Sequence, residues 1–364
     1  MTDLRSFLER AIGPFDPTPD RALDLTTRRA AQRQRRRRAG AAVVGLTASL
    51  LALGVVVWAF AGRDGTRPAG AQRGTFVFIG GDALAAENRL YSMNADGSDL
   101  RAIPTGDLFL MAAAPSPDGE RIALMASEPW PRGDMPSAQL FLMNADGSDL
   151  VKVPACRDDG CQGTILVSWS PDSRSLSFPG NGTGIYVLDV ETGTSRRLTG
   201  GSQDDGAVFS PDGRRIAFAR TEPSVDPEPN AQIWVMDADG ASAHQLTDAA
   251  VAHEATQPAW SPDGTRIAYT EGGEPGGTAG IAMVNVDGSA ARQLTACTFG
   301  SCERFPTNPV WSPDGSAIAV LWQEARLTGT AIALVDPESG DLRIVRELPF
   351  SASSLTWQVG TANT

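Results

Sequence analysis

The feature that most constrains this chain is an internal repeat with a period of about fifty residues. The tripeptide Ser-Pro-Asp occurs five times, at spacings of 54, 40, 51 and 51 residues, and begins at Ser116, Ser170, Ser210, Ser261 and Ser312. A second motif is an apolar run that ends in Asn or Asp before a Gly-containing turn, at Asn94, Asn144, Asp189, Asp237, Asn285 and Asp336. Two turn motifs that keep one period indicate a repeat protein, and this length is typical of β-propeller blades.

Each repeat predicts four antiparallel strands. The tetrapeptide Ser-Pro-Asp-Gly suits a tight turn because Pro fixes its own backbone torsion, Asp bonds nearby backbone groups and Gly accepts a left-handed conformation. Short runs such as 266–270 and 281–285 are rich in Ile, Val and Tyr, as strands are. An aromatic residue directly before the serine is expected to fill the space between neighbouring sheets, at Trp169, Phe209, Trp260 and Trp311.

The full pattern resembles a known propeller family. W-S-P-D-G-x-x-I-A, followed by M-x-x-D-G and Q-L-T, is similar to the TolB-type, WD-repeat-like propellers over residues 75–358. The resemblance implies an all-β fold built of blades. It does not imply one function, because such propellers serve as scaffolds, transport components and accessory domains of enzymes.

The two ends of the repeat region predict how the ring closes. Blade 1 begins at Thr75 with a strand of the second type and lacks the first. The segment 355–358 matches a first strand, with Trp357 in the aromatic position. The last strand is therefore expected to complete blade 1, which gives a six-bladed, all-β propeller over 75–358 without an open sheet edge, followed by a tail at 359–364.

The N-terminal region predicts a membrane anchor. The segment from Ala41 to Phe60 holds twenty residues without a charge, the length of a helix that spans the lipid bilayer. Arginines before this segment outnumber those after it, so the N-terminus is expected in the cytoplasm and the propeller outside a bacterial cell membrane. The expected order is a cytoplasmic Arg-rich leader at 1–40, a single-pass transmembrane helix at 41–61, and a flexible linker at 62–74. A cleavable signal peptide is the alternative.

The charge distribution limits the kinds of partner that the chain can bind. The formal net charge is -12, yet the first 40 residues carry ten Arg against five acidic residues, so the remainder carries -17. An acidic body excludes a nucleic-acid-binding surface. The segment 1–38 is expected either to lie on anionic lipid or to bind a cytoplasmic partner.

The candidate binding residues lie on one face of the ring. The tight turns lie on one side, which we name the turn face, and the longer connections lie on the opposite side, the loop face. Variable loops on a rigid frame usually carry binding, so an unknown protein or small ligand is expected on the loop face. The candidate residues there are Asp158, Asp159, Asp204, Asp205, His253 and Glu254. Their acidity favours a basic partner or a cation, and a merely solvated rim is the alternative.

Four cysteines form two pairs with the spacing C-x4-C, Cys156 with Cys161 and Cys297 with Cys302. Each pair is expected to form a disulfide within its loop in an extracytoplasmic domain. A shared zinc site is excluded because the two loops leave blades on opposite sides of the ring.

No catalytic chemistry is predicted. The sequence contains no G-x-S-x-G, H-E-x-x-H or phosphate-binding loop, so no catalytic residue, metal or cofactor is expected. We interpret the chain as a binding scaffold. The alternatives are a transmembrane regulator that couples ligand binding outside to the leader inside, and an enzyme that uses the loop face.

Overall fold

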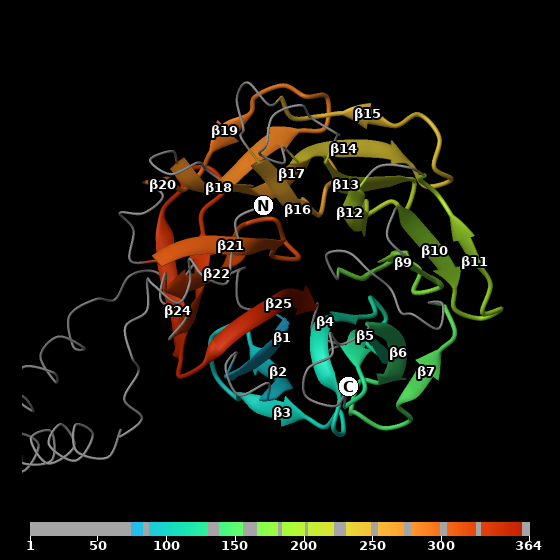
Figure 1. Cartoon of the computed structure of the whole chain (residues 1–364). Helices are drawn as coiled ribbons and strands as arrows, with labels where there is room; N and C mark the ends of the chain where they lie inside the picture. The colour runs from blue at the N-terminus through green and yellow to red at the C-terminus, as the bar shows by residue number, and fades with distance from the viewer. Residues whose placement is uncertain are drawn as a thin grey trace, which may run out of the picture. The chain divides into compact units, whose positions relative to one another are not determined.

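The computed structural model describes residues 74–82, 87–129, 138–155, 166–180, 184–200, 203–221, 231–248, 254–272, 278–298, 304–324 and 329–358. These residues form six antiparallel sheets, which follow one another around a ring (Figure 1). The predicted leader, anchor and tail, and the linker up to residue 73, lie outside the described residues. Within the described ranges, no helix is long and apolar enough to cross a bilayer.

In each blade the strands follow one another from the innermost to the outermost. Blade 1 consists of β25 (Ser351–Gln358), β1 (Thr75–Asp82), β2 (Glu87–Asn94) and β3 (Arg101–Ile103). Blade 2 consists of β4 (Phe109–Pro115), β5 (Arg121–Ser127), β6 (Gln139–Asn144) and β7 (Val151–Val153). Blade 3 consists of β8 (Ser168–Trp169), β9 (Ser175–Pro179), β10 (Ile185–Asp189) and β11 (Ser195–Arg197).

The other three blades repeat this order. Blade 4 consists of β12 (Gln203–Phe209), β13 (Arg215–Thr221), β14 (Ala231–Asp237) and β15 (His244–Gln245). Blade 5 consists of β16 (Glu254–Trp260), β17 (Arg266–Gly272), β18 (Thr278–Asn285) and β19 (Arg292–Gln293), with β20 (Cys297–Thr298) paired to β18. Blade 6 consists of β21 (Arg304–Trp311), β22 (Ile318–Glu324), β23 (Thr330–Val335) and β24 (Leu342–Leu348).

The ring closes in the predicted way. Strand β25 pairs antiparallel with β1, so that Phe76 lies opposite Trp357 and their rings pack with centroids 4.7 Å apart. Each of the six buried apolar clusters is shared by two neighbouring blades. The cluster that joins blade 6 to blade 1 includes Phe78, Leu321 and Leu355. The prediction of a six-bladed propeller completed by its last strand is confirmed.

The Ser-Pro-Asp turns are held by the serine hydroxyl, as blade 4 illustrates. Ser210 Oγ donates a hydrogen bond to Asp212 Oδ1 at 2.6 Å and accepts one from the Arg215 backbone N–H at 2.9 Å. Gly213 follows with a φ of 69°. In blade 3 the same left-handed position is held by Ser173, with a φ of 60°. The turn therefore survives the loss of glycine.

The turn carboxylates predict acid sensitivity. The Ser210 hydroxyl is the main cause that holds the pKa of Asp212 below its ordinary value. A carboxylate with a depressed folded-state pKa stabilises the fold above its unfolded-state value and loses that contribution as the pH falls through the folded-state pKa. We expect the free energy of unfolding in urea, followed by tryptophan fluorescence, to stay level between about pH 7 and 5 and to fall below about pH 4.

A serine variant tests whether the turn carboxylate causes this loss of stability at low pH. Ser210→Ala removes the hydroxyl that bridges the turn, and it is expected to cost about 1–2 kcal/mol at neutral pH. The cost should shrink as the pH falls through the folded-state pKa of Asp212, because the protonated carboxyl no longer gains from the hydroxyl. An equal cost above and below that pKa would contradict the role of the carboxylate.

Neighbouring blades are also joined by arginine–tryptophan pairs. An arginine at the first position of the second strand stacks on the tryptophan of the next blade, with the guanidinium carbon 5.0 Å from the ring centroid in each of three pairs. The pairs are Arg121 with Trp169, Arg215 with Trp260 and Arg266 with Trp311. Each indole N–H also donates to a carbonyl of the preceding inner strand, at 2.8 to 3.2 Å. The predicted packing role of these rings is confirmed, with a polar component added.

One of these pairs can be measured directly. Arg215→Met keeps most of the aliphatic stem and removes the charge over Trp260, so we expect a loss of about 0.5–1 kcal/mol in the free energy of unfolding. The neighbouring Arg214 is exposed, and Arg214→Met should change stability by less than about 0.5 kcal/mol. Equal effects of the two variants in urea titrations would rule out a specific contribution from the stack.

Candidate functional site

Asp204 and Arg220 form a buried ion pair at the loop-face end of blade 4. The guanidinium donates to both carboxylate oxygens, from Nε at 2.6 Å and from Nη2 at 3.0 Å. The Asp204 side chain has 0% of its surface exposed and that of Arg220 has 16%. The guanidinium carbon also lies 4.6 Å from the ring centroid of Trp234.

This pair corrects one prediction. The interpretation of Asp204 as part of a solvated acidic rim is wrong. The strand register places this residue directly opposite Arg220, and its side chain is buried. Its carboxylate is used inside the blade and does not face a partner. The pair instead joins the loop-face ends of β12 and β13.

Two further candidate residues lie at the loop-face ends of inner strands. Glu254 is exposed and begins β16, opposite Gly272. A Cβ atom at Gly272 would stand 2.9 Å from Glu254 Oε2, so the carboxylate lies directly over this glycine. Asp205 is half-buried in β12. Of the candidate side chains that the structure describes, Glu254 is the one fully available to a partner.

The remaining candidates lie outside the described residues. Asp158, Asp159 and His253 belong to connections that the structure does not describe. The same holds for Cys156, Cys161 and Cys302, so both disulfides stay predictions. The backbone of Cys297 is described, and it pairs with Ala279 in β18. The start of this loop is therefore held against blade 5 on the loop face.

The inner strands contain polar residues that sequence reasoning missed. Gln257, Asn308 and Ser354 adopt left-handed conformations, with φ of 53°, 57° and 54°, at an irregularity in their strands. Asn308 N donates to Gln257 Oε1 at 3.0 Å, and Asn308 Nδ2 donates to Leu355 O at 3.2 Å. Ser354 Oγ accepts from Ala113 N at 2.8 Å. These bonds join four consecutive blades and offset a backbone strain of about 1 kcal/mol per residue.

Over the described ranges, no three His, Cys, Asp or Glu residues are placed so that they could hold a metal ion. Burial raises the pKa of Tyr269 to about 12, so its hydroxyl stays protonated at neutral pH. Among the polar side chains of the inner strands, those of Gln257, Asn308 and Ser354 are used in hydrogen bonds between blades.

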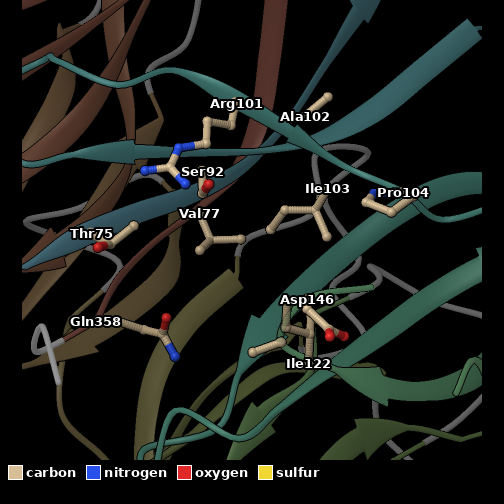
Figure 2. Close-up of a pocket in the computed structure, with 11 residues that line it drawn as sticks. Thr75, Val77, Ser92, Arg101, Ala102, Ile103, Pro104, Ile122, Asp146 and Gln358 are labelled. Atoms are coloured by element: carbon tan, nitrogen blue, oxygen red, sulfur yellow. The ribbon is translucent and has the colours of Figure 1, made fainter. Parts of the chain in front are cut away.

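A cleft of about 300 Å³ lies between blades 1 and 2 on the turn face (Figure 2). Val77, Ile103 and Ile122 supply apolar walls, whereas Thr75 and Asp146 are among its polar lining residues. Figure 2 shows Val77 between Thr75 and Asp146, and Ile103 above Asp146 in this view. The cleft thus combines apolar walls with an exposed carboxylate.

Comparison with known proteins identifies relatives of this fold. The profile of the family described as "TolB beta propeller domain" matches residues 137–356. An uncharacterized protein of Agrobacterium fabrum is 30% identical over 163 residues, which cover 42% of this chain and 53% of the relative. The Tol-Pal system protein TolB of Francisella tularensis is 32% identical over 170 residues, 46% of this chain and 37% of that protein. The chain thus matches about half or less of the length of these curated relatives.

Solved structures agree at the level of the fold. The crystal structure of TolB from Acinetobacter baumannii aligns with a TM-score of 0.61 at 18% identity. The alignment covers 79% of this chain and 67% of that one.

Proposed function

The chain belongs to the TolB beta propeller domain family, and from this premise we propose that it is a protein-binding scaffold without catalytic activity of its own. The observation that supports the proposal is the closed ring, in which inner strands are joined across blades by Asn308, Gln257 and Ser354. Such a platform changes little on binding, and this limits the entropic cost of association. The partner binds the loop face, where Glu254 is exposed.

A charge reversal on each face tests this proposal. Full-length chains that carry Glu254→Lys or Asp287→Lys are compared with the unsubstituted chain by quantitative cross-linking in the native membrane. Both residues are exposed, but Asp287 lies in a turn of the turn face. Partners of the unsubstituted chain should be lost with Glu254→Lys and kept with Asp287→Lys. Loss with Asp287→Lys alone, or retention with both, would contradict binding on the loop face.

We also propose that residues 41–61 hold the propeller outside a bacterial cytoplasmic membrane. The uncharged run from Ala41 to Phe60 and the preceding arginines support this arrangement. The full chain should remain in the membrane fraction at alkaline pH, and added protease should remove the propeller from intact spheroplasts. Release of the chain by alkali would exclude the anchor.

The two disulfides are a separate prediction. Mass spectrometry without reduction should detect the disulfides Cys156–Cys161 and Cys297–Cys302.

A further inference from the structure

The turn-face cleft lies where the repeat lacks its own arginine–tryptophan pair. Strand register makes Thr75 the equivalent of Arg121, because they lie opposite Asn94 and Asn144. Register likewise makes Pro115 the equivalent of the stacked tryptophans, since each of them lies opposite the first apolar residue of the next strand. The blade 1–blade 2 interface therefore has neither the cation nor the ring.

The other interfaces without an arginine keep an aromatic ring. Blades 3 and 4 have Ser175 with Phe209, and blades 6 and 1 have Ala317 with Trp357. Phe209 packs against the apolar cluster that blades 3 and 4 share, and Trp357 packs on Phe76. Only the interface of blades 1 and 2, among the six that the structure describes, lacks both the arginine and the aromatic ring, and this is where the cleft of about 300 Å³ lies beside Thr75.

The lining of the cleft suits a guanidinium group on an aliphatic stem. Ile103 is partly exposed and can cover methylene groups, whereas Val77 and Ile122 line the cleft with only 2% of their surface exposed. Asp146 presents an exposed carboxylate, and hydrogen bonds from Ser148 hold the pKa of that carboxyl below its ordinary value. The carboxylate is therefore ionised at neutral pH. A planar cation with several N–H donors matches such a carboxylate better than a lysine ammonium does.

One cation already lies at the rim, and its charge is neutralised. Arg101 lines the cleft, but its guanidinium is paired with the carboxylate of Asp99. The pair lies on blade 1, whereas Asp146 lies on blade 2. A second cation that enters from solvent therefore meets a neutral pair on one wall and a carboxylate on the other.

We propose that this cleft binds an arginine side chain presented by a partner protein. The guest takes the place that Arg121, Arg215 and Arg266 occupy at the other interfaces. Its guanidinium bonds the Asp146 carboxylate while its stem lies on the apolar walls. The site is on the turn face, so it goes beyond the proposed loop-face function and does not depend on it.

Short blocked peptides provide the probe. The full-length chain in detergent micelles is titrated with acetyl-Ala-Arg-Ala-amide by ligand-observed NMR, beside otherwise identical peptides that carry citrulline or lysine. Citrulline keeps the shape of arginine without its charge. We expect the arginine peptide to bind at least about tenfold more tightly than either of the others. Equal dissociation constants for the three peptides would overturn the proposal.

Variants of the chain locate the site. Asp146→Asn is expected to weaken binding of the arginine peptide about tenfold. Asp287→Asn is the matched control, because Asp287 accepts the same turn hydrogen bond from Ser289 at 2.9 Å that Asp146 accepts from Ser148. Thr75→Arg together with Pro115→Trp builds the missing pair within the chain and should abolish binding. Both Asn variants lie in exposed turns, so the test does not depend on the folding of the double variant.

Two further outcomes would overturn the proposal. Equal weakening by Asp146→Asn and Asp287→Asn would show a diffuse charge effect on the turn face. The second concerns the chain itself, because Arg73 stands two residues before Thr75 in the sequence. Binding of the arginine peptide only after Arg73→Ala would make the chain's own arginine the occupant and exclude a partner.

Discussion

Deletion of residues 351–364 is expected to prevent the propeller from folding, whereas deletion of residues 359–364 is expected to leave it intact. The longer deletion removes β25, which pairs with β1 and contributes Ala352 and Leu355 to the cluster between blades 6 and 1. The loss leaves β1 as an open edge and exposes one of the six interfaces. Since domains are stable by only about 5–15 kcal/mol, no cooperative unfolding transition should remain. Near-ultraviolet circular dichroism during a urea titration measures this.

A single substitution gives the same test on a smaller scale. Leu355 has 2% of its surface exposed, and Leu355→Ala is expected to cost about 2–5 kcal/mol. Ser353 lies on the same strand and is exposed, so Ser353→Ala should change stability by less than about 0.5 kcal/mol. A cooperative transition with an unchanged midpoint in the chain that lacks 351–364 would show that the ring does not depend on its closing strand.

Asp204→Ala is expected to lower the free energy of unfolding by about 3–5 kcal/mol, the second large effect. The substitution removes the carboxylate that accepts from both Nε and Nη2 of the largely buried Arg220 guanidinium, and removing one member of a buried ion pair is costly. Glu128 and Lys152 form a matched pair at the surface, 3.5 Å apart with side chains 63% and 47% exposed. Glu128→Ala should therefore cost less than about 1 kcal/mol. Urea titrations of the two variants measure the difference.

A double variant separates the pair from its surroundings. The cost of Asp204→Ala can be tested for its origin in the buried Arg220 guanidinium, which loses this carboxylate. If that is the origin, Arg220→Met in the same chain should restore part of the lost stability. An additive effect of the two substitutions would argue instead that each side chain contributes through other contacts, such as the stack of Arg220 on Trp234.

The repeats made the fold predictable because each turn encodes its own geometry. Ser-Pro-Asp-Gly specifies a hairpin through bonds within a few residues of the chain, as at Ser210 and Asp212. The closing strand was also predictable, because a blade that lacks its first strand at Thr75 matches a single strand around Trp357. Local chemistry and the count of strands were sufficient for these conclusions.

The features that the sequence did not reveal arise between blades. Asp204 looks like one more acidic loop residue until the register places it opposite Arg220. The stack of Arg266 on Trp311 joins residues whose relation depends on the angle between two sheets. The strained Asn308 leaves one local signal, an asparagine three positions before the aromatic residue, but its partners lie in other blades. Such contacts depend on how the blades are placed, so they cannot be predicted from the sequence until the fold is known.

Closure by the last strand also imposes an order of events during synthesis. Phe76 and Trp357 pair across 281 positions of the chain, so β1 leaves the ribosome long before its inner neighbour exists. At about 5–20 residues per second, that delay lasts roughly 15 to 60 s. Throughout it, β1 can have β2 on one side and an unoccupied row of backbone donors and acceptors on the other. The nascent protein can therefore pair with other chains through this strand, and that hazard lasts until β25 has been made and pairs with β1.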